Sequence, residues 1–79
     1  MNPSSPTTDA AANLTQRAQT YLDLGRPADA VPALLDALGQ APGDHQALCL
    51  MALAHSNLGN RAEAVRWADR AIEAAPSHE

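Results

Sequence analysis

Apolar residues recur along the chain at the three- and four-residue spacing of amphipathic helices. Four such stretches, separated by turns rich in Gly and Pro, predict helices over about 9–24, 27–40, 44–58 and 61–75. The first ends at Leu24-Gly25 and the third at Leu58-Gly59, and glycine just past a helix adopts the left-handed conformation that closes it. Residues 1–8, rich in Pro, Ser and Thr, are expected to form a disordered lead.

The residues at the predicted helix starts differ in how well they cap. Asp44 follows the Pro42-Gly43 turn and is a good N-cap for the third helix. Asn60 and Glu63 have the spacing of a capping box for the fourth. Pro27 suits the first position of the second helix. Pro32 removes a hydrogen bond to the Ala28 carbonyl and should bend or loosen the first turns of that helix.

The chain repeats itself at an offset of 34 residues, which indicates a helical hairpin used twice. The matching pairs are Leu14/Leu48, Ala18/Ala52, Gly25/Gly59, Ala30/Ala64, Val31/Val65, Ala37/Ala71, Leu38/Ile72 and Pro42/Pro76. The alanines among them are small where two helices must approach closely. We therefore divide the chain into the lead, a first unit over 9–43, and a second unit over 44–79 with a short tail.

This pattern resembles the tetratricopeptide repeat family over residues 11–78. The positions that carry the resemblance read Leu14, Ala18, Tyr21, Ala30, Ala37 and Pro42 in the first unit, and Leu48, Ala52, His55, Ala64, Ala71 and Pro76 in the second. The resemblance implies an all-α fold in which two helix-turn-helix units stack as a short right-handed solenoid. Three positions depart from the family pattern: Arg17 replaces leucine, His55 replaces tyrosine, and Ala68 replaces an aromatic residue that Trp67 precedes by one position.

In tetratricopeptide arrays the first helix of each unit lines a concave groove that receives a peptide. By position, the resemblance assigns the groove to Ala12, Thr15, Gln16, Gln19, Leu22, Asp23, Gln46, Cys49, Leu50, Leu53, Ser56 and Asn57, with Leu22, Leu50 and Leu53 as apolar anchors. Periodicity does not separate groove from core, so some of these residues are equally expected to pack against neighbouring helices. The lysine clamp with which one subfamily holds acidic chaperone tails is absent, because Thr15, Gln19 and Leu50 stand in its place and the chain has no lysine.

A stack of repeats leaves an apolar face open at its last helix unless something covers that face. Trp67 and Ile72 are the large apolar residues we expect on this terminal face. Trp67 can equally be an intramolecular packing residue. One expectation is a homodimer through the last helix; the alternative is that the chain is the N-terminal regulatory or substrate-recruiting part of a larger enzyme.

Composition narrows the range of partners. The net charge is −4, and five arginines without lysine form no basic stripe, so we expect no nucleic acid partner. We expect no membrane span, because no stretch approaches the ~20 apolar residues that one requires. A start that lacks a secretory pattern and a single cysteine favour the cytoplasm. The expected partner is a protein or peptide.

His45 and Cys49 are the candidate chemical pair, because residues four apart share one helix face. Zinc sites need more ligands, and neither His55 nor His78 is suitably placed to supply one, so we predict no metal. No oxyanion site or orienting group accompanies the pair. The sequence therefore predicts a non-enzymatic chain with no catalytic residues and no cofactor.

Overall fold

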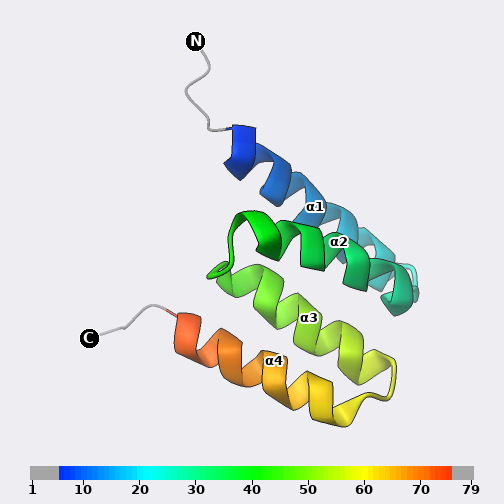
Figure 1. The fold of residues 1–79 in the computed structure, drawn as a ribbon. Helices are drawn as coiled ribbons and strands as arrows, with labels where there is room; N and C mark the ends of the chain where they lie inside the picture. The colour runs from blue at the N-terminus through cyan, green and yellow to red at the C-terminus, as the bar shows by residue number, and fades with distance from the viewer. Residues whose placement is uncertain (1–5, 76–79) are drawn as a thin grey trace.

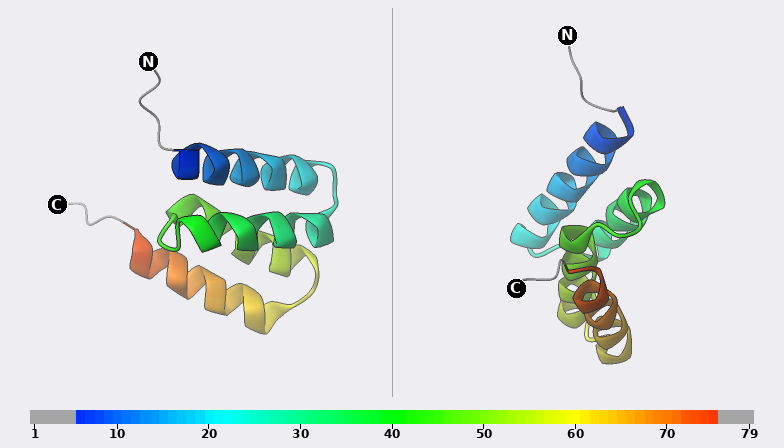
Figure 2. Two further views of the ribbon diagram at one scale, coloured as in Figure 1. Left: turned by 45° about the horizontal axis from the view of Figure 1, so that its top comes forward. Right: turned by 90° about the vertical axis from the view of Figure 1, so that its left-hand side faces the viewer.

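The computed structural model describes residues 6–75, with side chains from Ala10 onward. This part of the chain forms four α-helices: α1 (Pro6–Asp23), α2 (Pro27–Gln40), α3 (His45–Asn57) and α4 (Arg61–Ala74). The helices follow one another from α1 to α4, which lie at opposite ends of the stack in every view (Figures 1 and 2). The predicted all-α architecture of two stacked helical hairpins is confirmed.

The start of α1 differs from the expected one. The helix begins at Pro6, so residues 6–8, which the sequence analysis assigned to a disordered lead, are helical. Proline tolerates the first helical position because its missing N–H would have had no intrahelical partner there. Residues 1–5 of the expected lead, like residues 76–79 of the expected tail, lie outside the described residues.

A glycine turn joins the two helices of each hairpin, and the two turns have the same geometry. Gly25 has φ of 74° and Gly59 has φ of 81°. In the first turn the Arg26 N–H donates to the Tyr21 carbonyl over 2.8 Å, and in the second the Asn60 N–H donates to the His55 carbonyl over 2.8 Å. This bond from the residue after glycine, five residues back, defines the Schellman helix ending. The 34-residue repeat in sequence is thus a repeat in backbone structure.

The helix starts confirm one predicted cap and overturn the other. The Asp44 carboxylate accepts from the Gln46 and Ala47 N–H groups over 3.0 and 3.4 Å, as an N-cap does. The Asn60 side chain makes no cap hydrogen bond. Its amide instead lies 3.4 Å from Nδ1 of His55, since the Schellman turn brings these two side chains together. The capping box predicted for Asn60 is therefore wrong.

One buried cluster, with residues from all four helices, forms the core. α1 packs on α2, α3 packs on α4, and α2 and α3 join the units. The largest fully buried side chains are Leu34 of α2 and Leu48 and Met51 of α3. α2 continues through Pro32, which is exposed. Within the described residues, no helix is long and apolar enough to cross a membrane.

Candidate functional site

A groove of about 370 Å³ lies along α1 and the start of α3. Five of the residues assigned to a peptide groove from the sequence lie together here, and the full lining consists of Ala12, Thr15, Gln16, Gln19, Asp44 and Gln46. Carboxamides dominate the polar groups of this surface. We call it the amide groove.

Hydrogen bonds fix part of this lining. Thr15 is buried and its hydroxyl donates to the Ala11 carbonyl over 2.9 Å. This side chain therefore forms the floor of the amide groove, and its hydroxyl is already hydrogen-bonded within the chain. Gln19 is half-buried and donates from Nε2 to the Asp23 carboxylate over 3.3 Å. Gln16 and Gln46 are exposed on the walls. A carboxamide offers both donors and an acceptor, which matches the groups of a peptide backbone.

Two of the three predicted apolar anchors are core residues. Leu22 is 9% exposed and Leu50 is 7% exposed, and both belong to the buried cluster that joins the helices. The prediction that they anchor a partner is wrong for this arrangement, because their surface is already used within the chain. Leu53, at 44% exposure, remains available.

Of the other predicted groove residues, Asp23 is exposed at the end of α1, outside the groove lining, and the rest lie further along α3. Cys49 and Asn57 are exposed, while Ser56 and Leu53 line a different cavity, formed with α4. The surface that the sequence suggested as one continuous groove is therefore divided into two cavities.

His45, which contacts Cys49, also forms a hydrogen bond to the end of α4. Nδ1 of His45 lies 2.9 Å from the Ala71 carbonyl, and because a carbonyl only accepts, the Nδ1–H group is the donor. Nε2 lies 3.5 Å from the Cys49 sulfur. Ala71 is in the last turn of α4, where carbonyls lack intrahelical partners. The imidazole thus ties α3 to the end of α4.

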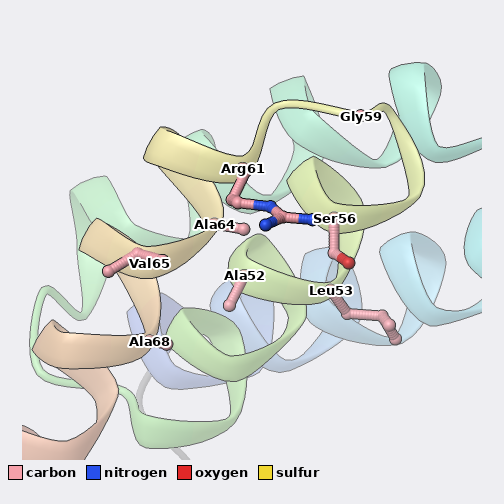
Figure 3. Close-up of a pocket in the computed structure, with 8 residues that line it drawn as sticks. All are labelled: Ala52, Leu53, Ser56, Gly59, Arg61, Ala64, Val65 and Ala68. Atoms are coloured by element: carbon pink, nitrogen blue, oxygen red, sulfur yellow. The ribbon is translucent and has the colours of Figure 1, made fainter.

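The second cavity, of about 640 Å³, lies between α3 and α4 on the face that points away from α2 (Figure 3). Three alanines contribute to its lining, together with Leu53, Ser56, Gly59, Arg61 and Val65. We call it the terminal groove. An open terminal face was expected from the sequence, but not the residues that shape it. The 34-residue offset contained the signal, because it equates Ala52, Ala64 and Ala68 with positions of the first unit that are fully buried.

Trp67 and Ile72 have opposite surroundings. Ile72 is 71% exposed, so it lies on the surface as predicted for the terminal face. Trp67 is partly buried against the core, and the Arg70 guanidinium lies 4.7 Å from the centre of its ring. Trp67 therefore has the intramolecular packing role that the sequence left open, with a cation–π contact to Arg70, and its part in a terminal interface stays a prediction.

A comparison with protein-family models matches residues 15–79 to the tetratricopeptide repeat. Comparisons with curated proteins and with solved structures find no match. The matched segment contains both glycine turns and all of α2, α3 and α4. The family model, the repeated Schellman turns and the 34-residue period agree, and the chain belongs to the tetratricopeptide repeat family.

Proposed function

We propose that this chain is a non-catalytic binding module that holds an extended peptide segment of a partner protein in the amide groove. Tetratricopeptide repeats act generally as protein–protein interaction modules. The observation that supports this site is the convergence of Gln16, Gln19 and Gln46 around a floor formed by Thr15. Extended peptides present unpaired N–H and carbonyl groups, which such side chains pair with.

The charge of the groove favours a neutral or basic peptide. Asp44 is the charged residue in the lining, and no arginine contributes to it. A carboxylate-rich peptide would therefore approach a negative group without a cationic partner. This agrees with the absence of lysine from the chain, which argues against acidic chaperone tails.

The test is a selection of random displayed peptides on the full chain, followed by NMR mapping of the selected peptide. Amide shifts should centre on Gln16, Gln19 and Gln46. Gln16→Ala and Gln46→Ala should each weaken binding about fivefold, because a hydrogen bond contributes about 1 kcal/mol. Arg66→Ala, on the exposed face of α4, is the matched control and should leave affinity unchanged. Shifts confined to α3 and α4 would contradict the assignment to the amide groove.

A further inference from the structure

The terminal groove exposes apolar side chains from both helices of the second unit. Leu53 borders it from α3 and Val65, 53% exposed, from α4, above a floor of alanines. Arg61 reaches from the start of α4 toward Ser56 (Figure 3). Neither of the two ion pairs among the described residues includes Arg61. The groove is therefore apolar with one cation at its end.

The first unit shows what covers this surface when it is occupied. Leu38 is 8% exposed, whereas its counterpart Ile72 is 71% exposed. Ala30 is fully buried, whereas its counterpart Ala64 is only partly buried. In the first unit this face is covered by α3, which packs on α2. The terminal groove is thus shaped to receive a helix.

The opposite end of the stack is unsuited to fill the groove by head-to-tail stacking. α1 would have to take the position of α3 in such a stack. Met51 and Ala54 are buried on α3, whereas their counterparts on α1, Arg17 and Thr20, are exposed. Burying an arginine without a partner is costly. A head-to-tail contact is therefore disfavoured.

The outward face of α4 fits a second α4 running antiparallel to it. Val65, Ala68, Ile72 and Ala75 follow one another at three- and four-residue spacing, so they form one stripe. Arg61 continues this stripe at the first residue of the helix, where the positive end of the helix dipole disfavours a cation. In an antiparallel pair centred on Ala68, position 61 of one copy lies opposite position 75 of the other, beside the negative end of that helix. Arg61 is thus complementary in charge to the end of a second α4.

We propose that two copies of this chain pair through the terminal groove about a two-fold axis at Ala68. The α4 helix of each copy lies in the terminal groove of the other, and Ile72 of each contacts the other copy near Leu53 and Val65. Ala68 permits close approach at the axis because its side chain is small. Arg61 of each copy lies beside the last turn of the other α4. This surface is separate from the amide groove, so the two proposals succeed or fail independently.

The first test measures mass by light scattering on the full chain across dilutions from micromolar to millimolar concentration. The expected result is a dimer that dissociates on dilution. Ile72→Asp should raise the dimer dissociation constant about tenfold or more, because an apolar contact becomes a buried carboxylate. Leu35→Asp is the matched control, since Leu35 is 50% exposed on α2, and it should leave that constant unchanged. A wild-type monomer at every concentration would overturn the proposal and leave the groove for a helix of another protein.

The second test identifies the helix pairing. Ala68→Cys in a Cys49→Ser background should form an intermolecular disulfide under mild oxidation, because the axis brings the two substituted positions within the span of that bond. Leu35→Cys in the same background should not. Circular dichroism of each reduced variant checks that the fold is retained. A dimer that fails to crosslink through position 68 would overturn the antiparallel arrangement.

Discussion

At the residue scale, the two glycine turns use different side chains for the same packing task. The Arg26 guanidinium lies 5.6 Å from the centre of the Tyr21 ring. One unit later, the Asn60 amide lies 3.4 Å from Nδ1 of His55. In both turns the residue after glycine contacts a ring five positions earlier. Histidine in place of tyrosine therefore keeps the contact but makes it polar, and it occupies the side chain that would otherwise cap α4.

Because Asp44 caps its helix and Asn60 does not, the two side chains should contribute differently to the free energy of unfolding. Asp44→Ala should lower the free energy of unfolding by about 1 kcal/mol, because two N–H groups of α3 lose their acceptor. Asn60→Ala should lower it by only about a few tenths of that, since its exposed side-chain contact is weak. Urea unfolding followed by circular dichroism measures both. An equal or larger loss for Asn60→Ala would show that Asn60 caps α4 in solution.

At the element scale, glycine has two different roles in the chain. Gly59 holds the left-handed conformation that ends α3, while Gly39 lies inside α2. A Cβ atom added at either position would meet nothing within 4 Å. Only backbone conformation therefore distinguishes the two sites.

Alanine should have opposite effects at these two glycines. Gly59→Ala should cost about 1–2 kcal/mol, because an L side chain is strained at this φ. Gly39→Ala should add about 0.5 kcal/mol, because alanine is the better helix former. Thermal unfolding of the two variants beside the wild type measures the difference. A stabilised Gly59→Ala variant would contradict the assigned role of the turn.

The sequence predicted the helix ends more reliably than the helix faces, for a physical reason. Helix ends depend on local chemistry. The end of α1 and the starts of α2 and α3 lie within a residue or two of Gly25, Pro27 and Asp44. Faces depend on what lies beside the helix. Leu22 and Leu50 match groove positions by register, yet the neighbouring helices cover both. Five of the predicted groove residues line one cavity because they follow the same register on α1 and α3, but that this cavity binds a partner stays a prediction.

At the scale of the whole molecule, the hairpins depend on one shared core. Leu34 of the first unit and Leu48 and Met51 of the second are all nearly inaccessible. Hairpins of this length are marginal alone, because isolated short helices are unstable in water. Each unit thus obtains much of its stability from the other, and a repeat protein of this size should unfold as one cooperative unit.

Trp67 reports on this coupling, since it is the single tryptophan and lies in the second unit, whereas Leu34 lies in the first. Leu34→Ala should lower the free energy of unfolding by about 2–5 kcal/mol, because it opens a cavity between the units. The Trp67 fluorescence midpoint in urea should shift together with the midpoint from circular dichroism. Leu35→Ala, at an exposed neighbouring position, should shift either midpoint little, and Leu34→Val provides a milder variant that stays folded. The contrary result would be a Leu34→Ala variant whose fluorescence midpoint is unchanged while its circular dichroism midpoint moves to lower urea concentration. That result would mean that the second unit stays folded without the first, and that the core between α2 and α3 does not couple them.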